Sequence, residues 1–483
     1  MLPATSVSFQ TDDAALQRLF DLAEARCQRN LQSFGGRQVL VEGGGYEKIW
    51  LETQPMGGEM YAARNLTAAL NNTLFFMETQ RADGRLAGSI QCHKDGRIEP
   101  QFNKFQGFCF PWPALSLYYL TGRSRAYLDA LAQCLERFDA YLWKTRDTDG
   151  DGCLESFCVY DTGEDNAVRY GGAPVYCETD TPPRDAPVVP MASMDIMSFS
   201  YAARDTLARI SRIRGDGQGA AWERKAQAVA HALKARLWDE QKGACYDRDN
   251  TGRAMPILTH NNLRCMYWGS FSREMADRFV RDHLLCPEEF WTPLPLPSVA
   301  ANDPAFRNAP ENNWSGQVEG LTYQRAILAL ERYGYEPLVT SLGQKFLKAI
   351  VAGGYLFTQQ FDPFTGAPSR VSTLTHAPLG PEEDEPLQDA YGPTLLAALE
   401  YIAHIWGVRR QMDEIWFSLG SGPAFTYEQH WGEHTYRIDS DGKKARVLLD
   451  SREIFASPCG VRVITDERGD VLRVRAIENK AAQ

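Results

Sequence analysis

A polar loop from Thr162 to Tyr170 carries two adjacent carboxylates, Glu164 and Asp165, with Arg169 close behind them. Hydrolysis of a sugar acetal needs a proton donor for the leaving oxygen and, in the inverting case, a second carboxylate that activates water. Asp165 is a candidate for this donor in surroundings that favour its protonated form. The simpler interpretation of two acidic residues in a polar loop is a solvated surface.

Aromatic residues that precede or lie in this loop could form a wall on which a sugar ring stacks. They are Trp50, Phe105, Phe108, Phe110, Trp112, Tyr160 and Tyr170. Because core packing accounts for most aromatic residues in most proteins, this set supports a sugar site without establishing one.

A further carboxylate, Glu319, ends the segment Asn312–Glu319, which opens a predicted helix. It is either a favourable partner for the helix dipole or a carboxylate aimed into the open end of a helical scaffold. The loop Gly353–Gly366 combines Gly and Pro with a short apolar run between two helix patterns, as binding loops often do. The acidic run Glu382–Glu385 is interpreted as a solvated loop.

Three aspartates alternate with other residues in a turn: Asp147, Asp149 and Asp151. Their spacing resembles the first half of a calcium loop, whose hard oxygen ligands suit Ca²⁺. Cys158 stands where such a loop would place its bidentate Glu, so the full motif is absent. A solvated turn with the aspartates capping backbone amides is the favoured interpretation, and calcium is the alternative.

The elements that must position these residues are mainly helices. Apolar residues recur at helical spacing in ten segments: Leu16–Leu31, Met60–Gln80, Ala114–Leu120, Ser124–Trp143, Ala192–Ile213, Gly219–Leu237, Phe271–Leu285, Gly316–Arg332, Glu336–Val351 and Leu387–Trp406. Long loops with Gly, Pro and aromatic residues separate them, which is uncommon unless the loops are functional. Successive helix pairs with long loops at one end predict a toroid, although periodicity does not exclude a solenoid.

The pattern changes from about Met412 onward. Short alternating segments appear at Thr435–Ile438, Ala445–Leu449, Val461–Thr465 and Val471–Ala476, with turn residues between them. We therefore predict a helical domain over residues 1–410 and a small antiparallel, sandwich-like β-module over residues 411–483.

Composition excludes several classes of function. The 483 residues carry 51 Lys and Arg against 62 Asp and Glu, a net charge of −11, which argues against nucleic acid and anionic membranes as partners. The N-terminal segment does not resemble a secretory signal, and no apolar run is long enough to span a bilayer. Eleven scattered cysteines without metal-binding spacing predict free thiols in a cytoplasmic protein. The oligomeric state is not predicted.

Five motifs in order resemble those of clan G glycosidases, the (α/α)6-barrel enzymes related to processing α-glucosidase and mannosylglycerate hydrolase. Ile49–Glu52 followed by Gln80–Leu86 resembles their WDS…QxDG opening, Asp147–Glu155 their DxDGDGLxE stretch, Gly163–Arg169 their GxDNSPR motif, Trp314–Glu319 their WRGPVW motif, and Phe357–Gly366 their FYExYxPxTG motif. The resemblance implies a mostly α fold, a six-hairpin (α/α)6 toroid, with the β-module outside it.

Carried over residue by residue, the resemblance implies that Asp165 is the general acid. It also implies sugar-pocket roles for Trp50, Glu52, Arg169 and Trp314. Gln54 and Gln359 are predicted as further substrate-binding residues. No cofactor is predicted, with calcium at the aspartate turn as the alternative. Several positions depart from the family pattern. Gln359 stands where the family has its general base, Glu319 replaces the second Trp of WRGPVW, Glu52 replaces the Asp of WDS, and Ala167 and Val168 replace Ser and Pro.

A glutamine at position 359 cannot accept a proton from water. Glu319 or a residue of the acidic loop could have taken over the role, the local alignment could be shifted, phosphate could replace water as in an inverting phosphorylase, or activity could be lost. We predict an exo-acting, inverting glycoside hydrolase for a small glycoside or oligosaccharide, with Asp165 as acid and Glu319 as the catalytic base. The alternatives are a phosphorylase, an epimerase or an unsaturated-uronide hydrolase on the same fold, or a non-catalytic carbohydrate-binding protein.

Overall fold

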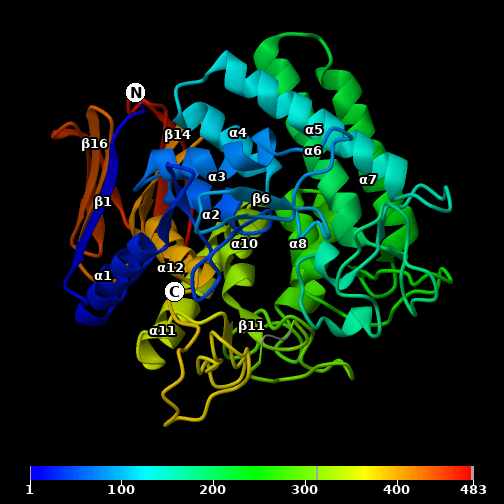
Figure 1. The fold of residues 1–483 in the computed structure, drawn as a ribbon. Coiled ribbons are helices and arrows are strands. Elements are labelled where there is room, and N and C mark those ends of the chain that lie inside the picture. The colour runs from blue at the N-terminus through cyan, green and yellow to red at the C-terminus, as the bar shows by residue number, and fades with distance from the viewer. Residues whose placement is uncertain (1, 312–313, 480–483) are drawn as a thin grey trace.

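The computed structural model describes residues 2–311 and 314–479, and α-helices make up most of its regular structure (Figure 1). The inner helices are α2 (Gln54–Tyr61), α4 (Pro111–Leu120), α6 (Met194–Arg214), α8 (Asn261–Trp268), α10 (Gly320–Glu331) and α12 (Gly392–Trp406). The outer helices are α1 (Ala14–Arg29), α3 (Leu66–Glu78), α5 (Arg125–Thr145), α7 (Gly219–Leu237), α9 (Arg273–Phe279) and α11 (Glu336–Ala352).

The inner helices close a ring. Each contacts the next inner helix along the chain, and α12 contacts α2. Outer helices pack against neighbouring members of the ring: α3 against α2 and α4, α5 against α4 and α6, and α11 against α10 and α12. A solenoid would not return its last helix to its first. The arrangement is therefore consistent with the predicted (α/α)6 toroid.

Burial separates the two sets of helices. All residues of α12 are buried, as expected for a helix that is apolar around its whole circumference. The outer helix α5 has a buried stripe and an exposed face, and the Ser124 side chain caps its first turn. The sequence thus places the apolar α12 inside the ring and the amphipathic α5 around it.

The prediction of one helix from Met60 to Gln80 is wrong, because α2 and α3 are separate helices. The sequence of α2 contains Gly57 and Gly58, which disfavour a helix and led to its interpretation as a loop. A Cβ on Gly57 would lie only 2.9 Å from the Leu396 side chain of α12. The glycines therefore allow close helix packing, which outweighs their low propensity. The short helix α8, which contains no glycine, was also missed.

Two antiparallel sheets lie against the helical ring. One has the order β13 (Val408–Gln411), β14 (Glu414–Leu419), β19 (Val461–Thr465) and β20 (Val471–Ala476). The other has the order β1 (Thr5–Thr11), β15 (Phe425–Trp431), β16 (His434–Ser440), β17 (Lys444–Leu449) and β18 (Arg452–Pro458). Strands β13 and β14 contact strands of the second sheet. An antiparallel β-region at the C-terminal end is thus confirmed.

One strand of the β-region comes from the other end of the chain. Strand β1 pairs with β15 from Thr5 opposite Trp431 to Thr11 opposite Phe425, and Figure 1 shows it alongside the C-terminal strands. Its signal in the sequence is weak, because only Val7 and Phe9 are apolar. The predicted boundary between residues 410 and 411 falls inside β13, and the division into two domains remains a prediction.

Short strands and turns tie the loops together. They are β2 (Leu31–Phe34), β3 (Arg37–Leu40), β4 (Ile49–Trp50), β5 (Ser89–Cys92), β6 (Ile98–Gln101), β7 (Glu155–Ser156), β8 (Met191–Ala192), β9 (Trp238–Asp239), β10 (Ala244–Cys245), β11 (Val318–Glu319), β12 (Gln360–Phe361), η1 (Val159–Asp161), η2 (Val168–Tyr170) and η3 (Val280–Leu284). All eleven cysteines are free thiols, and eight of them are buried. Each helix within the described residues is too short or too polar to cross a membrane.

Candidate active site

A cavity of about 360 Å³ opens at the end of the ring where α2, α10 and α12 begin. Its described lining consists of Glu42, Tyr46, Trp50, Glu52, Lys104, Gln106, Tyr160, Gly163, Asp165, Asn166, Tyr176, Glu311, Trp314, Leu321, Gln359, His376 and Tyr391. Six of the residues predicted from the sequence are among them: Trp50, Glu52, Tyr160, Asp165, Trp314 and Gln359. Helix N-termini carry partial positive charge, which favours the carboxylates gathered here.

Asp165 belongs to the loop between β7 and β8 and lies on what we call the acid wall, formed with Tyr160, Tyr176 and Trp314. The rings of Tyr160 and Tyr176 stack with centroids 5.0 Å apart, and Tyr176 is 47% exposed. Burial raises the pKa of Tyr160, and the nearby charge of Asp165 raises it further. The Tyr160 hydroxyl therefore faces the Asp165 carboxylate. The Trp314 amide donates to the Asp165 carbonyl at 3.4 Å.

The neighbouring carboxylate, Glu164, is turned into a buried ionic network. It pairs with Arg169 and with Arg264, and it accepts a hydrogen bond from Asn261 at 3.1 Å. Arg169 also pairs with Asp195 at 2.9 Å. Arg169 does not line the cavity. Its ion pairs instead stabilise the loop beneath Asp165.

The floor of the cavity is formed by Glu52 and Leu321, both buried. Glu52 pairs with Arg325, and Arg264 lies 3.6 Å away. Burial raises the pKa of Glu52 to about 7, although the two arginines lower it. Gly163 has a φ of +78°, and a Cβ there would overlap the Glu52 carboxylate. A glycine is therefore required for the acid loop to reach the floor.

Gln54 lies outside the described lining and supports it instead. Its side-chain oxygen accepts a hydrogen bond from the Trp50 backbone amide at 3.0 Å. The Trp50 ring lies 5.5 Å from the Lys104 ammonium group, which is also 5.1 Å from the Tyr176 ring. Burial lowers the pKa of Lys104 to about 8.

A second group of lining residues, which we call the tyrosine wall, consists of Glu42, Tyr46, Gln359 and Tyr391. The Tyr46 hydroxyl donates to the Gln359 side-chain oxygen at 3.2 Å. The Tyr391 hydroxyl donates to the Glu42 carboxylate at 3.0 Å. Burial raises the pKa of Glu42, which the Tyr391 hydrogen bond partly offsets. Sequence reasoning missed Glu42, although it precedes the glycine-rich segment that leads to Trp50.

Glu319 lies behind the lining, in strand β11, and has no exposed surface. Burial, followed by the charges of nearby carboxylates, raises its pKa well above the ordinary value. A hydrogen bond with the Gln359 side chain offsets this rise only in part. The residues Asn312 and Asn313 of the same predicted motif lie outside the described residues.

Most of the aromatic residues expected to form a stacking wall lie elsewhere. Trp50 and Tyr160 line the cavity, whereas Phe108 packs against Phe138 with ring centroids 4.5 Å apart. Phe105, Phe110 and Tyr170 are likewise buried, and Trp112 lies at the other end of the ring. Tyr46, Tyr176, Trp314 and Tyr391 provide the aromatic lining instead.

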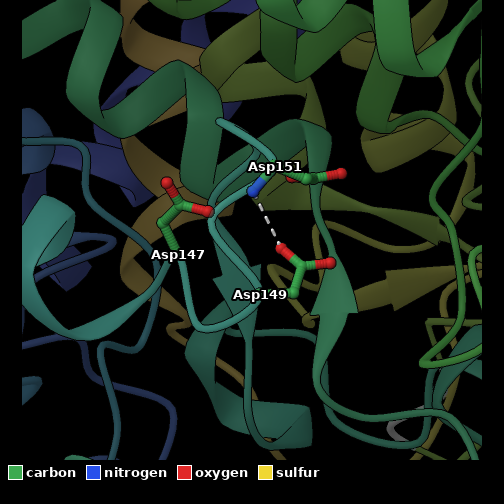
Figure 2. A group of neighbouring side chains, drawn as sticks. All are labelled: Asp147, Asp149 and Asp151. Carbon is green, nitrogen blue, oxygen red and sulfur yellow. Dashed lines mark hydrogen bonds between the residues drawn. The ribbon is translucent and has the colours of Figure 1, made fainter.

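Asp147, Asp149 and Asp151 gather in one turn, with one oxygen of each within 4.8 Å of the others (Figure 2). Asp149 accepts from the Asp151 amide at 3.1 Å and Asp147 from the Gly152 amide at 3.2 Å. Cys158 is buried and offers no ligand to this turn. The carboxylate oxygens that accept no hydrogen bond from an amide would suit a hard cation. The hydrogen bonds from the backbone amides account for the turn without a cation, and calcium remains the alternative prediction.

Comparison with known proteins identifies the family. Residues 61–377 match the mannosylglycerate hydrolase MGH1-like glycoside hydrolase domain. The GH63 mannosylglycerate hydrolase from Thermus thermophilus in complex with glucose has a TM-score of 0.62 at 18% identity, over 79% of this chain and 99% of that one.

Two further solved structures share the fold at lower identity. Neutral trehalase Nth1 from Saccharomyces cerevisiae has a TM-score of 0.54 at 14% identity, over 76% of this chain and 74% of that one. The α-L-rhamnosidase from Dictyoglumus thermophilum has a TM-score of 0.56 at 10% identity, over 92% of this chain and 44% of that one. Because the family match spans well over half of the chain, this protein belongs to the MGH1-like glycoside hydrolases.

Proposed function

We propose that this glycoside hydrolase removes a terminal sugar from a small glycoside or oligosaccharide with inversion of configuration, and that Asp165 is its general acid. The observation that carries the proposal is that Asp165 lines a cavity closed by Glu52 and Leu321 and flanked by Trp50 and Trp314. A volume of about 360 Å³ lies near the lower end of ligand cavities. A closed floor suits a chain end rather than an internal sugar.

The surroundings of Asp165 suit a proton donor. The carboxylate of Glu319 lies close enough to those of Asp165 and Glu52 to interact with both through their charges. Neighbouring negative charges favour the neutral form of a carboxylic acid. Asp165 would protonate the glycosidic oxygen as the bond to the anomeric carbon breaks, and a second carboxylate would take a proton from the attacking water. Glu319 and Glu42 are the candidates for that second role.

Replacing Asp165 with Asn tests the assignment. We expect hydrolysis of glycosides with poor leaving groups to fall by roughly 10²–10⁴-fold, since general acid catalysis supplies about that much. Asp185→Asn is a matched control, because Asp185 is exposed in the same long loop. Near-normal turnover in Asp165→Asn, with unchanged folding by circular dichroism, would reject the role.

Phosphorolysis is a second candidate, because the ammonium group of Lys104 lies beside the Trp50 and Tyr176 rings in the lining of the cavity. A cation of this kind could meet a phosphate nucleophile. Turnover that depends on inorganic phosphate and releases a sugar phosphate would favour it. Turnover in phosphate-free buffer that releases the free sugar would favour hydrolysis.

A further inference from the structure

We propose that Glu42 is the general base that activates the attacking water, in place of the glutamine at position 359. This assignment rests on the function proposed above and specifies its second carboxylate. Glu42 lines the same cavity as Asp165 but belongs to the tyrosine wall, whereas Asp165 belongs to the acid wall. Inversion requires the acid and the base to approach the sugar from different sides.

The geometry of Glu42 suits a base that is held in place. One carboxylate oxygen accepts the Tyr391 hydroxyl at 3.0 Å, and the Glu42 carbonyl accepts the Gly392 amide at 2.6 Å. The backbone is therefore fixed to the start of α12. Glu42 lines the cavity, and the residue is 7% exposed. Burial raises the pKa of Glu42, and the Tyr391 hydroxyl, by donating to the carboxylate, partly restores the ionised form that a base requires.

Glu42 also lies beside the residue that it replaces. Tyr46 and Tyr391 pack edge to face with ring centroids 6.2 Å apart. Tyr46 donates to Gln359, and Tyr391 donates to Glu42. The Tyr391 backbone amide in turn bonds to the Phe357 carbonyl at 2.9 Å, two residues before Gln359. The two side chains thus share one hydrogen-bonded wall.

The neighbouring carboxylates are less suited to the role. Glu319 has no exposed surface, so water in the cavity does not reach it. Glu52 is ion-paired with Arg325 and lies 3.6 Å from Arg264, so its charge is already engaged. Glu311 lines the cavity from the segment of Trp314, whose amide bonds to Asp165, and it would therefore approach from the side of the acid.

The proposed step is balanced in atoms and charge. Glu42 removes one proton from water while the water oxygen bonds to the anomeric carbon. The glycosidic bond breaks, its electron pair passes to the leaving oxygen, and Asp165 supplies the proton to that oxygen. Glu42 ends protonated and Asp165 ionised, and exchange with solvent restores both. The charges that face Glu42 are those of Glu52 and Asp165, together with the hydroxyls of Tyr391 and Tyr46.

Substitutions at Glu42, Asp165 and Glu47 test the assignment. We would screen the wild-type enzyme on 4-nitrophenyl glycosides, then measure each variant on the responding glycoside and on the corresponding glycosyl fluoride. We expect Glu42→Gln to lose roughly 10²–10⁴-fold on both substrates, because both need activated water. Asp165→Asn should keep the fluoride reaction, because fluoride leaves without a proton. Glu47→Gln, in an exposed position of the same loop, should match the wild type.

A small anion should bypass the missing base. We expect sodium azide to restore turnover of the 4-nitrophenyl glycoside by Glu42→Ala and to give a glycosyl azide of inverted configuration. Recovery would also show that the variant is folded. The assignment would be overturned if Glu42→Gln kept a turnover within about threefold of the wild type, or if Glu319→Gln lost more turnover than Glu42→Gln. The proposed function would stand in either case. A wild-type enzyme that hydrolyses no glycoside in the screen would overturn both.

Discussion

The two ends of the helical ring hold cavities of similar size that differ in how their buried carboxylates are paired. The candidate active site measures about 360 Å³, and the cavity between the other end of the ring and the β-region measures about 380 Å³. Both are lined by buried carboxylates. At the β-region, Glu331 pairs with Arg462 at 2.6 Å and with His404 at 2.8 Å, and these partners lower the Glu331 pKa to about 2.

At the candidate active site, Glu52 is paired with Arg325, but the buried carboxylates of Glu42 and Glu319 are not neutralised in this way. The pKa values of Glu42 and Glu319 are raised well above the ordinary range, because burial is the largest effect and nearby carboxylates add to it. Buried charges that are fully paired belong to structural interfaces, whereas perturbed and poorly compensated ones gather at functional sites. Cavity size alone would not have separated the two ends, but charge pairing does.

The largest effect on stability is expected from breaking the paired end. Arg462→Met leaves Glu331 buried with only His404 beside it, and loss of one partner from a buried pair costs about 3–5 kcal/mol. We expect the free energy of unfolding to fall by roughly that amount in urea titrations. Arg446→Met in the same β-region should change it little, because Arg446 is largely exposed and its nearest carboxylate is 3.9 Å away.

The pH dependence of the Arg462→Met effect sharpens this test. The pKa of Glu331 is about 2 in the folded protein and about 4.5 in the unfolded protein, so its ionised form stabilises the fold at pH values above 4.5. This stabilisation is lost as the pH falls toward 2. The difference between the wild type and Arg462→Met should therefore shrink on acidification. An equal difference at pH 7 and at pH 3 would contradict the pairing.

A smaller effect of opposite sign is expected at the other end. Glu319 has a raised pKa, so its ionisation favours the unfolded state as the pH rises above the unfolded value of about 4.5. Glu319→Gln removes this penalty and should stabilise the protein at pH 7 by on the order of 1 kcal/mol. The gain should be smaller at pH 4. Destabilisation at pH 7 would show that the hydrogen bonds of the Glu319 carboxylate outweigh the cost of its burial.

The sequence predicted the helical architecture better than its details. Apolar periodicity is strong in long helices such as α5 and α12, so both were found. The short helix α2 was missed because its glycines are selected by contacts with α12 and α3, and local propensity carries no information on such contacts. Strand β1 escaped notice because its partner, β15, lies at the far end of the chain.

The sequence predicted the site residues that belong to recognisable motifs. It missed those that only the packing of distant segments brings to the cavity. Asp165, Trp50 and Trp314 line the cavity because motif positions fix which loops meet at the mouth of the ring. Arg169 and Glu319 belong to similar motifs but lie behind the lining, since sequence spacing does not say which way a side chain points. Glu42 could not be recognised without the Tyr391 contact, 349 positions away.

The smallest effect tests how the tyrosine wall supports its carboxylate. Tyr391→Phe removes the hydroxyl that lowers the Glu42 pKa, so that pKa should rise further. A base must be ionised to act, so activity falls as the pH falls through its pKa. A hydrogen bond of about 0.5–1.5 kcal/mol corresponds to a shift of roughly 0.5–1 pH unit in the acidic limb of kcat/KM. The loss should be several-fold in the acidic limb of the profile and slight on the plateau above it, whereas a merely structural role would lower the whole profile equally.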